Sequence, residues 1–329
     1  GIGTMLIDIS LIVLGFGLLV VGGEVLVRGA VNLAERLRLS AFVIGGVVIG
    51  FGSSMPELVT SIEASLLGAP GIALGNIVGS NIINILVVIG VAALISPITL
   101  SARHVRVETI VVCVITAAFV ALCATLELTP LVGAISLVVL AVYLVYAVRR
   151  ETTTASSSTD TQLAHEVATQ AGSAPTSGRL HNGSLRIGCL VVAGLALLVF
   201  GGHLVVASAV SMAQAIGVGE AIIGLTIVAF GTSLPEIVTA VVAAYRRHAD
   251  VALGNVLGSC VFNLLAIGGA IAIISPADMP PEIVRFDNLV MLGAALILLL
   301  TISLSRQINR PVGAVFLGGY AIYLTAIWP

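Results

Sequence analysis

Long apolar runs constrain this chain more than any other feature of its sequence. A helix needs about 20 apolar residues to cross the hydrocarbon core of a bilayer, and only internally hydrogen-bonded backbone is tolerated there. Only 9% of the residues are charged, against about 25% in a soluble domain, so a soluble globular enzyme is excluded. The sequence predicts an all-α integral membrane protein with ten transmembrane helices. The predicted spans are residues 6–29, 40–67, 71–95, 104–125, 130–148, 186–210, 219–243, 250–275, 288–305 and 311–328.

The arginines predict how these helices are oriented. The chain has no lysine, and with ten spans thirteen of its 14 arginines fall in connections on one side of the membrane, with only Arg285 on the other. Connections rich in positive charge face the cytoplasm. We therefore expect a multi-pass protein of the cell (inner) membrane whose two termini are both external. The pattern also supports the count of ten, because nine or eleven spans would scatter the arginines.

One long polar stretch, residues 151–185, separates two halves of the chain. It is rich in Ser, Thr and Ala and poor in large apolar residues, a composition that cannot bury enough apolar surface to order itself. We expect a flexible cytoplasmic linker here. It would join a first five-helix repeat in residues 1–150 to a second five-helix repeat in residues 186–329.

The two halves carry the same sequence signature. Residues 44–97 align with residues 223–276 at a constant offset of 179 without gaps, and 23 of the 54 pairs are identical. The first copy reads G-F-G-S-S-M-P-E-L-V-T and A-L-G-N-I-V-G-S-N-I-I-N; the second reads A-F-G-T-S-L-P-E-I-V-T and A-L-G-N-V-L-G-S-C-V-F-N. Repeats that start five spans apart, an odd number, must lie upside-down to each other. Two inverted repeats of this kind are typical of secondary transporters.

Two glutamates occupy the same position in the two copies. Glu57 and Glu236 lie inside apolar spans, where a carboxylate costs several kcal/mol unless it is paired. No arginine lies close to them in either repeat segment. Two converging carboxylates would repel each other, and a bound cation would remove that penalty. The alternative is a pair of neutral, hydrogen-bonded acids that only pack helices together.

The surrounding residues offer further oxygens. Pro56 and Pro235 disrupt the preceding helical turn, which frees carbonyl oxygens around Gly52–Ser53 and Gly231–Thr232. Such an all-oxygen environment suits Ca²⁺, with its 6–8 oxygen ligands, or several Na⁺, whereas Mg²⁺ and soft transition metals fit it less well. Four-residue spacing places pairs of polar residues on one helix face: Ser53 with Glu57, Thr232 with Glu236, Ser80 with Asn84, and Ser259 with Asn263.

These motifs, residues 50–84 and 229–263, resemble the α-1 and α-2 repeats of the sodium/calcium exchanger family, in the cation/calcium exchanger superfamily. The resemblance implies electrogenic exchange of Na⁺ for Ca²⁺ across a lipid bilayer by alternating access, without a cofactor and without enzymatic activity. The first and sixth spans would slide as a gate. Ca²⁺ would bind the carboxylates of Glu57 and Glu236 and the carbonyl oxygens of Ser53 and Thr232. Sites for Na⁺ would add Ser54, Ser233, Ser80, Ser259 and the carbonyl oxygens of Gly50 and Ala229, and Asn84 and Asn263 would complete the centre.

Departures from the family pattern indicate the branch. Proton/calcium exchangers tend to carry an acidic residue where Gly79 and Gly258 stand, and potassium-dependent exchangers carry Asp where Asn263 stands. The chain therefore looks like a prokaryotic exchanger of the potassium-independent type. A Ca²⁺/H⁺ or other cation/H⁺ antiporter and a potassium-dependent Na⁺/Ca²⁺ exchanger remain alternatives. A cation channel and an intramembrane serine enzyme fit the duplicated motif less well. Cys260 replaces the usual Asn, which the first repeat keeps as Asn81.

Two charged positions outside the motifs carry separate expectations. Glu24 lies one turn before Arg28, a spacing that predicts a local ion pair. Glu108 stands near the start of a span and is expected to be an interfacial charge.

Overall fold

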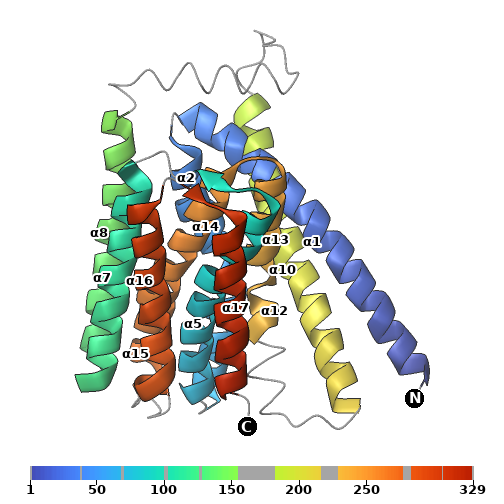
Figure 1. Cartoon of the computed structure of the whole chain (residues 1–329). Coiled ribbons are helices and arrows are strands. Elements are labelled where there is room, and N and C mark those ends of the chain that lie inside the picture. The colour runs from blue at the N-terminus through green and yellow to red at the C-terminus, as the bar shows by residue number, and fades with distance from the viewer. Residues whose placement is uncertain are drawn as a thin grey trace.

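The computed structural model of the chain is a bundle of long helices (Figure 1). It describes residues 2–37, 39–67, 70–99, 103–125, 128–154, 182–215, 229–276, 283–305 and 307–327. Within these ranges nine helices are long and apolar enough to cross a membrane. The predicted seventh span adds a shorter apolar helix at Leu234–Tyr245, while its residues 219–228 lie outside the described ranges. The predicted helical membrane architecture is confirmed.

The first half contains long helices and short interrupted ones, with two single turns of π-helix. Its elements are α1 (Ile2–Leu37), α2 (Ala41–Ile44), the π-helical turn η1 (Gly45–Ile49), α3 (Gly50–Ser53), α4 (Met55–Leu66), α5 (Pro70–Ile83), the π-helical turn η2 (Asn84–Val88), α6 (Ile89–Ile95), strand β1 (Ile98–Thr99), α7 (Arg103–Thr125) and α8 (Pro130–Thr154). The predicted linker follows, and its residues 155–181 lie outside the described part of the chain.

The second half repeats the central elements of the first half in the same order and differs around them. It contains α10 (Asn182–Ala215), α12 (Ala229–Thr232), α13 (Leu234–Tyr245), α14 (Ala249–Phe262), the π-helical turn η4 (Asn263–Ile267), α15 (Gly268–Ile274), the π-helical turn η5 (Ile283–Asp287), α16 (Asn288–Leu304), strand β2 (Gln307–Ile308) and α17 (Arg310–Ile327). Elements α12, α13, α14, η4 and α15 begin and end 179 residues after α3, α4, α5, η2 and α6. The sequence repeat is therefore also a structural repeat, and the opposite orientation of its copies stays a prediction.

Helices α5 and α14 lie at the centre of the bundle. In the spans that contain them, 83% of the most apolar window is buried, against 17% for α1. Helix α14 packs directly on η1, because a Cβ atom added to Gly258 would lie only 2.1 Å from the carbonyl oxygen of Gly46. Polar groups carried by these central helices are thus far from the outer surface.

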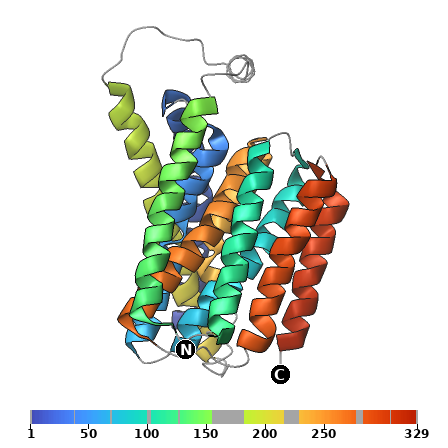
Figure 2. The same cartoon turned by 90° about the vertical axis from the view of Figure 1, so that its left-hand side faces the viewer.

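The outer helices pack around this centre in pairs. Helix α17 packs on α6, α16 on α7 and α15 on α8 (Figures 1 and 2). Helix α1 crosses α10 at one side of the bundle (Figure 1). A Cβ atom on Gly15 would lie 2.8 Å from the carbonyl oxygen of Gly201, so the backbones of the two helices are in contact. These are the first and sixth spans, and their sliding as a gate stays a prediction.

A small two-stranded sheet was not predicted from the sequence. Strands β1 and β2 pair antiparallel, with Ile98 opposite Ile308. Strand β1 lies in the connection from α6 to α7, and β2 lies in the connection from α16 to α17. The strand pair lies on the side of the bundle where α8 ends, whereas α1 begins and α17 ends on the opposite side (Figure 1). An even number of crossings, as in the ten-span prediction, puts the two ends of a chain on one side.

Candidate ion-binding site

Two helix breaks position the glutamates. Ser54 separates α3 from α4 with φ −84° and ψ 11°, and Ser233 separates α12 from α13 with φ −85° and ψ 3°. A proline lies in the first turn of each following helix, where its missing N–H is tolerated. Glu57 and Glu236 also lie in these first turns, and the positive end of the helix dipole favours a carboxylate there.

The two carboxylates are fully buried and are linked crosswise. The Ser54 hydroxyl of the first half donates to Glu236 Oε1 at 2.8 Å. The Ser233 hydroxyl of the second half donates to Glu57 Oε1 at 3.1 Å. Both glutamates are 0% exposed. Each carboxylate is therefore held by a hydroxyl from the opposite repeat, and the site exists only where the two halves meet.

Several oxygens of this centre have no hydrogen-bond partner among the described residues. They are Oε2 of Glu57, Oε2 of Glu236, Oδ1 of Asn84 and Oδ1 of Asn263. Buried polar groups are normally satisfied, and an unpaired buried charge is far more costly still. A cation coordinated by these oxygens would satisfy them, so the residues present fit a hard cation.

The hydroxyls extend the oxygen lining. Ser259 donates to the Gly50 carbonyl oxygen at 3.0 Å and lies 3.5 Å from Glu236 Oε1. Ser233 Oγ lies 3.3 Å from Ser80 Oγ. All three serines are 0% exposed. Within the described ranges no group of three or more His, Cys, Asp or Glu side chains could hold a metal, so the candidate ligands are mainly hydroxyl, amide and carbonyl oxygens around two carboxylates.

The structure brings together most of the residues that the sequence singled out. Hydrogen bonds form two groups, one of Glu236, Ser54, Ser259 and Gly50 and one of Glu57, Ser233 and Ser80. Asn84 and Asn263 open the turns η2 and η4 and are 0% exposed. Ala229 begins α12, next to residues outside the described ranges. The assignment of all these residues as ion ligands stays a prediction.

Ser53 and Thr232 use their hydroxyls for a different purpose. Ser53 Oγ donates to Asn255 Oδ1 at 3.2 Å, and Thr232 Oγ1 donates to Asn76 Oδ1 at 3.3 Å. Asn76 and Asn255 are 5% and 0% exposed. Neither asparagine was predicted from the sequence as a site residue. The signal was present, because both asparagines are identical at matched positions of the repeat.

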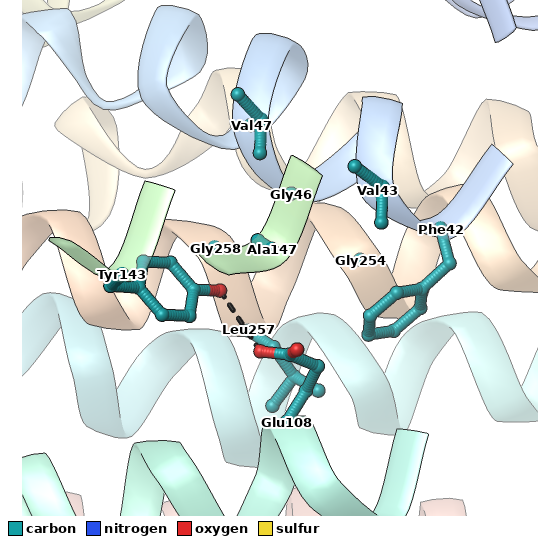
Figure 3. Close-up of a pocket in the computed structure, with 10 residues that line it drawn as sticks. All are labelled: Phe42, Val43, Gly46, Val47, Glu108, Tyr143, Ala147, Gly254, Leu257 and Gly258. Carbon is teal, nitrogen blue, oxygen red and sulfur yellow. Dashed lines mark hydrogen bonds between the residues drawn. The ribbon is translucent and has the colours of Figure 1, made fainter. Parts of the chain in front are cut away.

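A small cavity lies between α2, η1, α7, α8 and α14, and its lining does not include the residues of the two-glutamate centre (Figure 3). The volume of this cavity that the centre of a water molecule can occupy is about 10 Å³. Tyr143 donates to Glu108 Oε2 at 3.1 Å across it. Glu108 is only 7% exposed, so its prediction as an interfacial charge was wrong. Its position near a helix start does not reveal that α8 covers it.

The fold and the site together describe a multi-pass helical membrane protein with two buried carboxylates in an oxygen-lined centre. The sequence model of the family described as sodium/calcium exchanger protein matches residues 7–149 and 187–328. The chain belongs to this family.

Similar proteins cover the chain almost from end to end. An uncharacterized membrane protein of Methanocaldococcus jannaschii is 32% identical over 98% of this chain and 99% of its own length. The sodium/calcium exchanger MaX1 of Methanosarcina acetivorans is 29% identical, over 98% of this chain and 99% of its own. A solved structure of the sodium-calcium exchanger NCX_Mj, soaked with Na⁺ and Sr²⁺, superposes with a TM-score of 0.84 at 28% identity, covering 98% of this chain and 99% of that one.

Proposed function

We propose that the chain is a secondary antiporter that exchanges Na⁺ for Ca²⁺ across a membrane, and that it is not an enzyme. The observation that carries this proposal is the pair of buried carboxylates, each held by a serine of the opposite repeat and each with one unpaired oxygen. Two carboxylates neutralise one Ca²⁺, and the same oxygens can hold Na⁺ in its place. Membership of the family and the names of the similar proteins support the same exchange.

The oxygens of the buried centre supply the proposed ligands. Ca²⁺ would bind the carboxylates of Glu57 and Glu236 and the carbonyl oxygens of Ser53 and Thr232. Na⁺ would use these and the remaining oxygens of the centre: Ser54, Ser233, Ser80, Ser259, Asn84, Asn263 and the carbonyl oxygens of Gly50 and Ala229. Because the two ions share the carboxylates, they would compete, and competition for one centre that opens alternately to the two sides produces exchange.

The buried position of the site supports alternating access. Both glutamates are 0% exposed, so ions reach them only after a covering element has moved. Among the described elements, helices α1 and α10 contact each other more extensively than any other pair, and they would move together as the gate. Exchange of three Na⁺ for one Ca²⁺ would be electrogenic.

The proposed setting is the cell (inner) membrane, with both termini external and residues 151–185 as a cytoplasmic linker. Arginine placement supports this orientation, and so does the common end of the bundle at which α1 begins and α17 ends (Figure 1). A protease-cleavage site placed within residues 155–181 checks it in sealed right-side-out vesicles. Cleavage from the external side contradicts the orientation.

The function is tested with the purified full chain in liposomes. Ca²⁺ uptake is followed under an outward Na⁺ gradient, with K⁺ varied and pH gradients collapsed. We expect uptake that requires Na⁺ inside and is indifferent to K⁺. Uptake driven by a pH gradient without Na⁺ contradicts the coupling ion, and a strict need for K⁺ contradicts the potassium-independent assignment.

A further inference from the structure

We propose that Asn76 and Asn255 are positioning residues that couple the two halves of the ion site, without binding ions themselves. The inference rests on the proposed function, since it concerns how the same site holds its ligands. Both asparagines are identical in the two copies of the repeat and are buried, at 5% and 0% exposure.

Asn255 joins one half of the site to the other. Its amide nitrogen donates to the backbone carbonyl oxygen of Glu236 at 3.5 Å, within its own repeat. Its amide oxygen accepts the hydroxyl of Ser53, from the opposite repeat, at 3.2 Å. The turn that carries the Glu236 carboxylate is thereby tied to the helix end that carries the Ser53 carbonyl oxygen.

Asn76 makes the reciprocal connection. Its amide nitrogen donates to the backbone carbonyl oxygen of Glu57 at 3.3 Å, and its amide oxygen accepts the hydroxyl of Thr232 at 3.3 Å. The two sets of contacts are related by the offset of the repeat. The same pattern, formed twice in opposite directions, indicates a feature of the site rather than an accident of packing.

The chemistry of an amide allows only one orientation here. A carbonyl oxygen can only accept, so the amide nitrogen must face the glutamate backbone. The amide oxygen must then face the hydroxyl, which has to donate to it. Donation directs the Ser53 and Thr232 hydroxyls toward the asparagines, and the carbonyl oxygens of the same two residues are the groups proposed to bind the cation. An aspartate could not satisfy the glutamate carbonyl, and an apolar residue would satisfy neither partner.

The arrangement defines two kinds of residue pair. The contacting pairs, Ser53 with Asn255 and Thr232 with Asn76, each join opposite repeats. Ser53 and Asn76 belong to one repeat, and each binds a residue of the opposite repeat, because Ser53 donates to Asn255 and Asn76 accepts from Thr232. Energetic coupling between two mutations is expected for residues in contact and absent for residues without a shared partner. The pair Ser53 with Asn76 therefore serves as the matched control.

The test is a set of double-mutant cycles on the full chain. Ser53→Ala, Asn255→Ala, Asn76→Ala and their doubles are compared by Ca²⁺ binding in detergent and by Na⁺-dependent uptake in liposomes. We expect each single change to weaken Ca²⁺ binding roughly tenfold, as for loss of a buried hydrogen bond to a site residue. The double variant of Ser53→Ala and Asn255→Ala should also bind Ca²⁺ about tenfold more weakly, because both changes remove one contact. The double variant of Ser53→Ala and Asn76→Ala should bind Ca²⁺ about a hundredfold more weakly, because the two losses are independent.

The transport readout separates positioning from general damage. If the asparagines position ligands, their variants should show a higher KM for Ca²⁺ and a smaller change in kcat. Across the variants, the unfolding temperature measured without Ca²⁺ should not fall in proportion to the loss of Ca²⁺ binding. If Asn255→Ala does not fold, Asn255→Leu, which keeps the branched shape of the side chain, replaces it in the cycle. The inference is overturned if the fold-changes of the two single variants multiply in the contacting pairs just as they do in the non-contacting control. Lack of Na⁺-dependent uptake by the unmodified protein overturns the proposed function instead, so the two failures are distinguishable.

Discussion

The first and second repeats supply the same atoms to the ion site but support them differently. Each half contributes one buried glutamate, one serine to the opposite carboxylate and one asparagine to the opposite hydroxyl. Around this shared set the matched positions diverge. They pair Ser53 with Thr232, Ser61 with Ala240, Asn81 with Cys260 and Glu24 with His203. The two carboxylates and the serines that donate to them are therefore identical in the two halves, whereas other matched positions, including those of proposed ligands, differ.

The largest effect is expected for the glutamates, where the halves are identical. Glu57→Gln and Glu236→Gln each remove one of the two charges that balance Ca²⁺, so each should lower Na⁺-dependent Ca²⁺ uptake at least a hundredfold, the scale of a lost charge–charge contact in a buried site. Uptake in liposomes measures the effect. Equal losses at the two positions support a symmetric centre.

The matched control for these variants is Glu63→Gln. Glu63 lies on the same helix as Glu57 but is exposed, so its neutralisation should change uptake less than about threefold. Full exchange by Glu57→Gln, or a loss in Glu63→Gln as large as in Glu57→Gln, would remove the two-glutamate site from consideration.

The symmetric part of the site is also the part that the sequence could predict. The duplicated motif indicated Glu57 and Glu236, and Pro56 and Pro235 indicated the helix breaks at Ser54 and Ser233. These features are local, because a proline acts on its own turn. The composition likewise predicted the helical membrane class.

The remainder depends on contacts between distant segments. The crosswise donation by Ser54 and Ser233 becomes visible only when the two halves are placed together. Asn76 and Asn255 were overlooked because an asparagine in an apolar helix does not reveal its partners. Glu108 was misplaced for the same reason, since its cover is Tyr143 on another helix.

A smaller effect is expected at Cys260, where the second half carries a thiol and the first half carries the amide of Asn81. Cys260 is 1% exposed and close enough to Glu236 to interact with its charge. A sulfur favours soft cations, and an amide oxygen favours Ca²⁺. Cys260→Asn, which copies Asn81, should therefore shift the ratio of Ca²⁺ to Cd²⁺ affinity toward Ca²⁺ by roughly tenfold.

Competition between the two ions in a binding assay measures that ratio. Cys113→Ser is the matched control, because Cys113 is also buried but its thiol donates to the Ala295 carbonyl oxygen at 3.2 Å. An unchanged ratio in Cys260→Asn, or an equal shift in Cys113→Ser, would mean that the sulfur of Cys260 does not influence ion selectivity.

Ser61 gives the first half a support that the second half lacks. Its hydroxyl accepts from Asn76 at 2.9 Å and donates to the Ala73 carbonyl oxygen at 3.4 Å. The matched residue Ala240 has no hydroxyl. Ser61→Ala should lower the free energy of unfolding by about 1 kcal/mol, the net value of a buried hydrogen bond, and weaken Ca²⁺ binding less than threefold.

Thermal unfolding in detergent and Ca²⁺ binding test this expectation together. Asn76 keeps its contacts to Glu57 and Thr232 when Ser61 is shortened, so the coupling between the halves should survive. A loss of binding as large as in Asn76→Ala would show instead that Ser61 holds the asparagine in place.

A small effect on the transport rate is expected at the surface, where the matched positions of the two halves are Glu24 and His203. Glu24 on α1 forms the predicted ion pair with Arg28 and a second one with Arg246, whose Nε lies 3.0 Å from Glu24 Oε2. Arg246 caps the C-terminus of α13, so this contact ties the proposed gate to the bundle, whereas Arg28 lies within α1 itself.

Both arginines are well exposed, and such ion pairs contribute only about 0–1 kcal/mol. Arg246→Gln should therefore change the uptake rate less than about fivefold, more at low salt than at high salt, and Arg28→Gln should change it less. Equal rates for both variants at low ionic strength would show that the contact between α1 and α13 does not restrain the gate.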